Sequence, residues 1–216
     1  MQAANDTEKE KKAASEKAEA RPAPSWEPVW RSGEPVWQSW EPVWQRRSAT
    51  LHFRSIGRMN CNMGVRAELF GTQKLPNGAT LQVNVEELAN FGLTPEGKEH
   101  TGFHDAMWER IAKDTETVRS IWKRVDEKMA WVSKMETDVF VVFVCKWGKH
   151  RSVGMAGIAR HIFTRNGFDT TMPEHLSKQY WSQWKCGLRR CWCETMTQKK
   201  TEALEAVQGV FEEVFW

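Results

Sequence analysis

The sequence predicts an α/β domain in which a mixed, mostly parallel sheet is flanked by helices, with a strand–loop–helix unit at its core. Residues 139–144 consist only of valine and phenylalanine, which favours a central strand buried on both faces. Small and apolar residues between Val153 and Ile162 then favour a helix that packs closely on the sheet. A further strand and a long amphipathic helix precede this unit, and the alternation of strand and helix indicates a parallel sheet.

The loop between this strand and this helix has the composition of an anion-binding loop. Gly148 allows the backbone to approach a ligand closely or to take a positive φ, and Ser152 is the expected N-cap of the helix. Arg151 adds a planar, always-charged group suited to phosphate, and N–H groups at the helix N-terminus complete a phosphate cradle. The alternative is an ordinary turn with exposed basic residues. The 145–152 loop comprises Cys145, Lys146, Trp147, Gly148, Lys149, His150, Arg151 and Ser152.

The rest of the domain is expected to surround this unit. Alternating residues predict two strands, and apolar residues at steps of three and four predict one long helix that starts at Asp105. A glycine- and proline-rich loop, a short edge strand and a closing amphipathic helix complete the prediction. In chain order these elements are the strands 50–56 and 81–85, the loop 90–104, the helix 105–132, the edge strand 168–172 and the helix 198–215.

Length and composition suit one domain plus tails. The chain has 216 residues, of which 27% are charged and 40% hydrophobic, and its net charge is +3. It has no apolar run of about 18 residues, so no membrane span is expected, and no apolar stretch of a secretory signal near Met1. An odd number of cysteines in such a chain favours reduced thiols and an intracellular, cytoplasmic location. The cysteines are Cys61, Cys145, Cys186, Cys191 and Cys193.

Residues 1–48 are predicted to be a disordered, low-complexity tail, and the domain is expected to begin near residue 49. Its second part, residues 25–45, repeats a Trp-Glu-Pro-Val-Trp unit in which proline blocks a regular helix. One interpretation is a linker grown by duplication; the other is a multivalent docking segment whose tryptophans anchor a protein partner. These tryptophans are Trp26, Trp30, Trp37, Trp40 and Trp44.

The stretch 145–153 carries a family resemblance. It reads Cys-Lys-Trp-Gly-Lys-His-Arg-Ser-Val and resembles the phosphate loop of the RapZ C-terminal domain family, which reads Cys-x-x-Gly-Lys-His-Arg-Ser-Val. The likeness continues upstream in residues 53–57, in residues 83–90 and in the Thr-Gly pair at 101–102. Its order and spacing fit over roughly residues 49–176.

This resemblance implies a RapZ C-terminal-like domain at residues 49–216, with an extension over 177–216 that is rich in cysteine, tryptophan and basic residues. Such a domain binds a phosphorylated small molecule, a sugar phosphate or a nucleotide, and requires no cofactor. Asn84, His104 and His175 are then expected to join the 145–152 loop in binding the ligand. Bacterial members are linked to a kinase-like N-terminal domain and act as adaptors that also bind small RNA. This chain lacks a Walker A sequence, and its N-terminal part is of low complexity. The resemblance therefore implies the ligand-binding fold and does not carry over the adaptor role, so a regulatory or RNA-binding adaptor is a separate hypothesis.

The chain departs from the family pattern at positions that bear on the ligand. Asn84 and Glu86 stand where an acidic and a basic residue are expected, which removes one positive charge near the ligand. His104 and Asp105 stand where a single aspartate is expected, so either is a candidate equivalent. Trp147 replaces a glycine inside the loop.

The same loop also fits the signature of cysteine-dependent phosphatases, which is cysteine, five residues, arginine and then serine or threonine. Cys145 would be the nucleophile, Arg151 would hold the phosphate oxygens, and Asp105 or Asp114 would be the general acid. Against this alternative, Val144 stands where those enzymes usually carry histidine. Binding without catalysis is therefore the preferred interpretation.

The C-terminal extension offers two further hypotheses. A zinc site would combine His175 with three thiols, although their spacing lacks a Cys-x-x-Cys pair; unpaired thiols are the alternative. Between residues 178 and 200 there are six basic residues and one acidic residue, interleaved with tryptophans. This pattern suits RNA or a phosphorylated ligand, and a solvated basic face is the alternative. The zinc hypothesis names His175, Cys186, Cys191 and Cys193.

Overall fold

The structure, a computed structural model, describes residues 29–31, 34–36, 50–59, 78–132, 138–181, 186 and 192–216. The chain divides into two units, Met1–Trp40 and Glu41–Trp216. In the first unit, strands β1 (Val29–Arg31) and β2 (Glu34–Val36) pair antiparallel, so two neighbouring copies of the repeat form a short ribbon. The remainder of the predicted disordered tail, with its other tryptophan repeats, lies outside the described residues.

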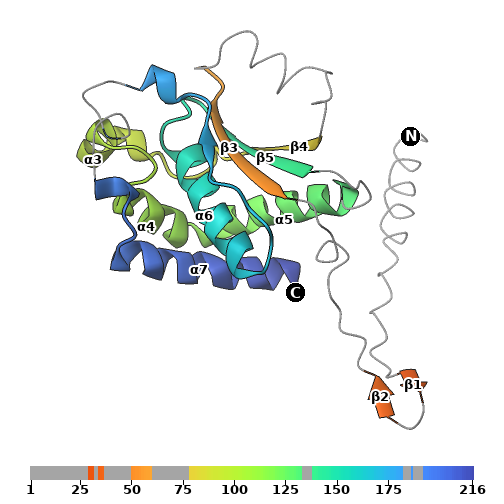
Figure 1. The fold of residues 1–216 in the computed structure, drawn as a ribbon. Helices are drawn as coiled ribbons and strands as arrows, with labels where there is room; N and C mark the ends of the chain where they lie inside the picture. The colour runs from red at the N-terminus through yellow and green to blue at the C-terminus, as the bar shows by residue number, and fades with distance from the viewer. Residues whose placement is uncertain are drawn as a thin grey trace, which may run out of the picture. The chain divides into compact units, whose positions relative to one another are not determined.

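The second unit holds a four-stranded parallel sheet with the order β4-β5-β3-β6 (Figure 1). The valine and phenylalanine run forms β5, which pairs with a strand on each side and is therefore central, as the sequence predicted. The α/β class and the parallel sheet are thus confirmed. The strands are β3 (Leu51–Gly57), β4 (Gly78–Asn84), β5 (Asp138–Cys145) and β6 (Glu174–His175).

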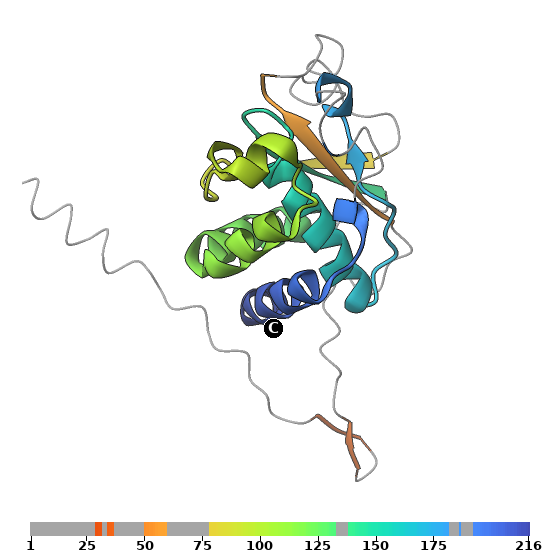
Figure 2. The same cartoon turned by 90° about the vertical axis from the view of Figure 1, so that its left-hand side faces the viewer.

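The longer helices lie on one side of this sheet (Figures 1 and 2). Helix α6 packs on β3 and β5, helix α5 packs on β4, and the C-terminal helix α7 packs on α4, α5 and α6. The closing helix is confirmed, and its apolar side is buried against the others. The helices are α3 (Pro95–Glu99), α4 (Asp105–Lys113), α5 (Thr115–Val132), α6 (Arg151–Arg165) and α7 (Gln198–Phe215), with short 3-10 turns η1 (Phe91–Leu93), η2 (Lys178–Tyr180) and η3 (Trp192–Glu194).

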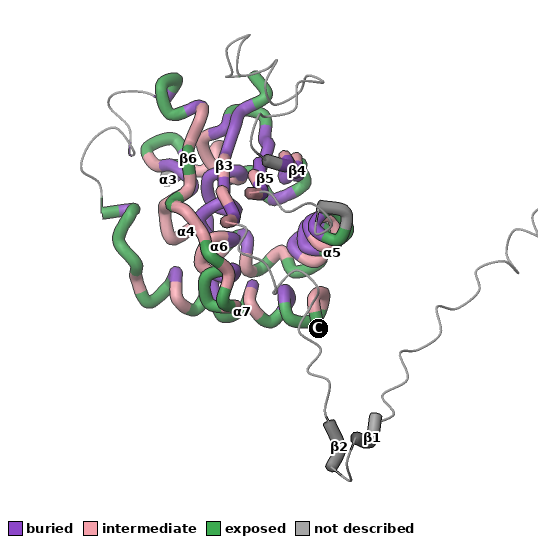
Figure 3. The backbone as a smooth tube through the Cα atoms, turned by 45° about the vertical axis from the view of Figure 1, so that its right-hand side comes forward, coloured by how far each residue is buried: buried purple, intermediate pink, exposed green. Residues whose placement is uncertain are grey.

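The core follows from the alternation of side chains along the strands. Val141 and Phe143 face the helices, where they join a cluster that includes Trp122 and Phe163. The alternate residue Val142 faces the other side of the sheet, in a smaller cluster that also contains Ile56 and Val144. Figure 3 shows the buried residues gathered in the strands and on the helix sides turned towards them. The strand β5 is therefore buried on both faces, which explains why its sequence carries no polar alternation.

Three predicted elements are wrong in detail. The expected loop 90–104 contains the 3-10 turn η1 and the helix α3. The expected single helix from Asp105 is two helices, because Asp114 takes a non-helical conformation (φ −94°, ψ 58°) and separates α4 from α5. The expected edge strand 168–172 is only an isolated bridge at Thr170, and the strand β6 comes later, at Glu174–His175. Pro173 lies between them and has no N–H to donate to β3, so the ladder is interrupted there.

No helix in the described part of the chain is both long enough and apolar enough to span a membrane.

Candidate functional site

The 145–152 loop lies at the carboxyl edge of the sheet, where β5 ends and α6 begins. The end of β3 lies beside it: Gly57 pairs with Cys145, and the amides of Arg58 and Met59 donate to the carbonyls of Cys145 and Lys146, each at 2.9 Å. Ligands of parallel α/β proteins bind outside this edge of the sheet. The loop therefore lies at the edge of the sheet where a ligand-binding loop is expected.

Gly148 has the left-handed conformation that the sequence allowed, with φ of +65°. A Cβ atom at this position would overlap the backbone of Gly57 and would lie 2.6 Å from the Oγ of Ser177. The same Ser177 Oγ accepts a hydrogen bond of 2.8 Å from the amide of Gly57, and the indole N–H of Trp181 donates to the carbonyl of Gly148 at 3.2 Å. The residues 177–181, which sequence reasoning did not connect with the loop, therefore fix its conformation.

The thiol of Cys145 lies inside the loop. The amide of Gly148 donates to its sulfur at 3.3 Å, and the hydroxyl of Ser152 lies 3.2 Å from the same sulfur. Cys145 is only 3% exposed and Ser152 is fully buried. The prediction that Ser152 caps the helix is wrong: His150 is the N-cap, its side chain makes no capping bond, and Ser152 lies in the first turn with its hydroxyl on Cys145.

Arg151 is the first residue of α6, and its guanidinium is held by backbone carbonyls. Its Nη1 donates to the carbonyl of Glu86 at 2.5 Å and to that of Leu88 at 3.2 Å. Because a guanidinium carries five N–H donors, these two bonds leave three donors, on Nη2 and Nε. In the part of the chain that the structure describes, no carboxylate forms an ion pair with Arg151. The residue is thus positioned and still has donors for an anion.

Two histidines around the loop are held neutral. The Nε2 of His150 lies 2.8 Å from the carbonyl of Gly97 and 3.1 Å from that of His100, so Nε2 carries the proton. Burial, and after it the charge of Lys149, lowers the pKa of His150 to about 4. The Nδ1 of His175 is hydrogen-bonded to Ser55 Oγ at 2.7 Å, and burial lowers the pKa of His175 to about 4.

These pKa values predict a loss of stability in acid. Both histidines bind a proton in the unfolded chain below a pKa of about 6.5 but in the folded chain only near 4. The unfolded state therefore holds more protons between these values, so stability is complete above pH 6.5 and falls as the pH is lowered towards 4. Each histidine contributes a slope of up to about 1.4 kcal/mol per pH unit. His175→Gln should reduce the slope measured by urea unfolding from pH 7 to pH 4; an unchanged slope would contradict the account of His175.

The remaining loop residues lie at the surface. Lys146 is exposed, its ammonium is 5.5 Å from the centre of the Trp147 ring, and Trp147 is 51% exposed. Lys149 donates from Nζ to the carbonyl of Lys98 at 3.3 Å. The lysines therefore put positive charge at the mouth of the loop.

Asn84, a predicted ligand residue, ends β4 at the same edge of the sheet. Its Oδ1 accepts a hydrogen bond of 3.0 Å from the amide of Glu86. It lines a hollow of about 380 Å³ together with Arg58, Gln82, Glu86, Lys128 and Val144. Because Asn84 pairs with Val144, which directly precedes the loop, the structure places Asn84 close to the loop.

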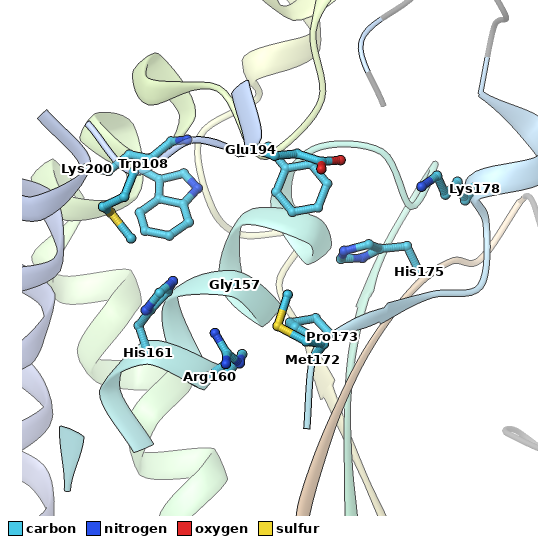
Figure 4. Close-up of a pocket in the computed structure, with 12 residues that line it drawn as sticks. Trp108, Gly157, Arg160, His161, Met172, Pro173, His175, Lys178, Glu194 and Lys200 are labelled. Atoms are coloured by element: carbon cyan, nitrogen blue, oxygen red, sulfur yellow. The ribbon is translucent and has the colours of Figure 1, made fainter. Parts of the chain in front are cut away.

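A second hollow of about 250 Å³ lies beside α6 (Figure 4). Trp108 forms an aromatic wall of this hollow (Figure 4). Its basic groups include the side chains of Arg160, His161, Lys178 and Lys200. The Nε of Arg160 is buried and has no hydrogen-bond partner among the described residues. His175 lines this hollow, and its ring lies 5.9 Å from that of Trp181, whose indole N–H donates to the carbonyl of Gly148.

The predicted catalytic acids have other contacts. Asp105 begins α4, and its Oδ1 lies 3.7 Å from the Nζ of Lys200, which also donates to the carbonyl of Cys193 and, at 2.7 Å, to that of Thr195. Burial lowers the pKa of Lys200. Asp114 forms the C-cap of α4. Neither carboxylate has a contact with Cys145.

Of the four predicted zinc ligands, Cys193 lies in a group of possible metal ligands among the described residues. The sulfur of Cys193 lies 3.2 Å from the Nδ1 of His100, and His104 completes a group of three donors. His104 therefore lies with His100 and Cys193, and its ring packs on Phe91, which also contacts the ring of His150 in the loop. Cys186 is buried with its sulfur 3.7 Å from Thr101 Oγ1, and Cys191 lies outside the described residues.

Only some of the basic residues predicted to bind RNA are among the described residues. Lys199 pairs with Glu109 at 3.1 Å, and Lys200 is buried. Lys185, Arg189 and Arg190 lie outside the described residues.

Neither protein-family models nor curated proteins match this sequence.

Proposed function

We propose that this chain binds a phosphorylated small molecule, a sugar phosphate or a nucleotide, with its phosphate on the 145–152 loop. The observation that carries the proposal is the guanidinium of Arg151, which two carbonyls hold in place while three of its donors remain. It stands on the first turn of α6, whose terminal N–H groups have no acceptor within the helix. Charge-assisted bonds to a phosphate are the interaction that such an arrangement favours.

Charge supports the same ligand class. With His150 neutral, the loop carries the positive charges of Lys146, Lys149 and Arg151. A phosphate monoester has a charge between −1.5 and −2 at neutral pH, so the loop compensates it fully. The hollow beside Asn84 offers room for the remainder of the ligand.

The resemblance of the 145–152 loop to the RapZ C-terminal domain family also supports this proposal. A regulatory adaptor that binds RNA through the 178–200 segment and a protein through the tryptophan repeats is part of the same proposal. Since phosphorylated metabolites and reduced thiols occur inside cells, the proposed location is cytoplasmic.

A thermal-shift screen tests the ligand class. Sugar phosphates and nucleotides are compared with the same sugars and nucleosides without phosphate, in a buffer free of phosphate and sulfate. A ligand at 100 times its Kd should stabilise the chain by about 2.7 kcal/mol. At least one phosphorylated compound should raise the melting temperature while its partner without phosphate does not. Equal shifts for both members of every pair would contradict the proposal.

The second candidate function is a cysteine-dependent phosphatase, which the 3.2 Å contact between Ser152 and Cys145 favours. The thiolate would attack phosphorus while the P–O bond to the leaving group breaks and an acid protonates that oxygen. We expect no such turnover, because Cys145 is 3% exposed and Asp105 contacts Lys200.

An assay with p-nitrophenyl phosphate decides between the two functions. The parent chain should release no more nitrophenol than Cys145→Ser, and Cys145→Ser should keep most of the affinity for the phosphorylated ligand, since the amides and Arg151 bind it. Turnover by the parent that disappears in Cys145→Ser would establish the phosphatase instead.

A further inference from the structure

Three metal-ligating side chains that do not belong to the 145–152 loop meet beside it. His100 lies in the connection between α3 and α4, His104 is the N-cap of α4, and Cys193 belongs to η3. One donor atom from each of these residues lies within 4.8 Å of the other two. The cluster therefore joins parts of the chain that are 93 residues apart in sequence.

Neighbouring bonds hold Cys193 against the two histidines. The amide of Cys186 donates to the carbonyl of Glu99 at 3.0 Å, which places Cys186 next to His100. Beyond η3, the buried Lys200 donates to the carbonyls of Cys193 and Thr195. Cys193 is 7% exposed, so its sulfur is shielded from solvent. The cluster is thus part of the folded structure on both sides of the thiol.

The chemical type of the three ligand atoms decides which metal ion suits the cluster. One thiolate and two imidazoles are borderline-soft ligands that suit Zn²⁺, and Mg²⁺ or Ca²⁺ would require oxygen ligands. Zinc binds sulfur at about 2.3 Å and imidazole nitrogen at about 2.0 Å, so two such ligands at a tetrahedral angle lie about 3.5 Å apart. The observed separation of Cys193 Sγ and His100 Nδ1 is 3.2 Å, and a small opening of this pair would accommodate the ion.

We propose that His100, His104 and Cys193 bind one zinc ion, with a water molecule at the fourth position. The ion ties η3 to the start of α4 and so holds the C-terminal segment in place. This site shares no residue with the 145–152 loop, but it borders the loop, because the Nε2 of His150 lies 3.1 Å from the carbonyl of His100. Of the set that the sequence suggested, His175, Cys186, Cys191 and Cys193, it keeps only Cys193.

His104 must exchange one bond to take part. Its Nδ1 accepts a hydrogen bond of 3.2 Å from the amide of Ala106, which caps α4. Binding of the metal at Nδ1 replaces this bond, and binding at Nε2 moves the ring proton to Nδ1, which then no longer accepts. In either case one N-capping bond is lost, and its contribution is small beside that of a structural zinc site.

The zinc content of the purified full-length chain tests the proposal. After dialysis against metal-free buffer containing a reductant, plasma mass spectrometry should find about one zinc ion per chain. Cys193→Ser and His100→Ala should each lose most of this zinc. The matched controls His161→Ala and Cys145→Ser change the same residue types outside the cluster, and both should keep the zinc. Zinc retained in full by Cys193→Ser would overturn the proposal.

A spectroscopic titration covers the case in which a variant fails to fold. The parent chain, stripped of metal, is titrated with Co²⁺, which should give a sulfur-to-cobalt charge-transfer band that saturates at one equivalent and disappears when Zn²⁺ is added. The absence of both bound zinc and a cobalt–thiolate band would exclude the site. An intense blue Cu²⁺ complex in a chain that keeps no zinc would identify a copper site instead and would also overturn the proposal.

Discussion

Gly148→Ala is expected to cost several kcal/mol of stability and to abolish ligand binding. Any residue other than glycine at φ of +65° carries backbone strain of about 1 kcal/mol. In addition, the new methyl group would overlap the backbone of Gly57 and would lie 2.6 Å from Ser177 Oγ, so the ends of β3 and β5 must separate. Overpacking of this kind adds about 1–3 kcal/mol. Urea unfolding measures the loss of stability.

Gly167→Ala is the matched control. Gly167 also has a positive φ, of +83°, but a Cβ atom there would meet no atom within 4 Å. This variant should lose only about 1 kcal/mol and should bind the ligand as the parent does. If both variants lose the same stability, the close approach of Gly148 to Gly57 is not what requires glycine.

Arg151→Ala should reduce affinity for the phosphorylated ligand by about 100-fold or more, since each charge-assisted contact contributes about 1.5–3 kcal/mol. It should also destabilise the chain by about 1–3 kcal/mol, because the carbonyls of Glu86 and Leu88 each lose a donor. Calorimetry measures the first effect and urea unfolding the second.

Two controls accompany this variant: one separates the charge of Arg151 from its geometry, and the other removes a basic group elsewhere. Arg151→Lys keeps the charge without the planar fork, so its affinity should lie between those of the parent and the alanine variant. Arg160→Ala removes a basic group from the hollow in Figure 4 and should leave the affinity unchanged. A Kd for Arg151→Ala equal to that of the parent would remove Arg151 from the site.

The sequence was most informative where the chain is buried on both faces. The valine and phenylalanine run identified β5, and the glycine and arginine after it located the loop at the N-terminus of α6. The break at Asp114 was missed because the apolar spacing of α4 continues unchanged into α5. Serine is a preferred N-cap, but that preference does not say where a helix begins, and α6 begins one residue before Ser152.

Long-range contacts at the site could not be read from local patterns. Ser177 and Trp181 fix the loop only because β6 pairs with β3, and that short strand carries no alternation that would reveal it. In the same way, His100 and Cys193 meet through tertiary packing, whereas a search by nearness in sequence selected His175. Residue types identified the chemistry of the 145–152 loop and of the cysteine–histidine cluster. Which residues lie together at each site depends on the tertiary fold.

The most direct test of the central claim is a ¹H–¹⁵N NMR titration of the full chain with the phosphorylated ligand from the thermal-shift screen. Binding on the 145–152 loop predicts the largest amide shifts at Gly148 and in the first turn of α6, with no such shifts from the ligand without phosphate. Shifts centred instead on Phe103, Arg160 and Lys178, the residues around the hollow in Figure 4, would contradict the assignment of the phosphate to the loop.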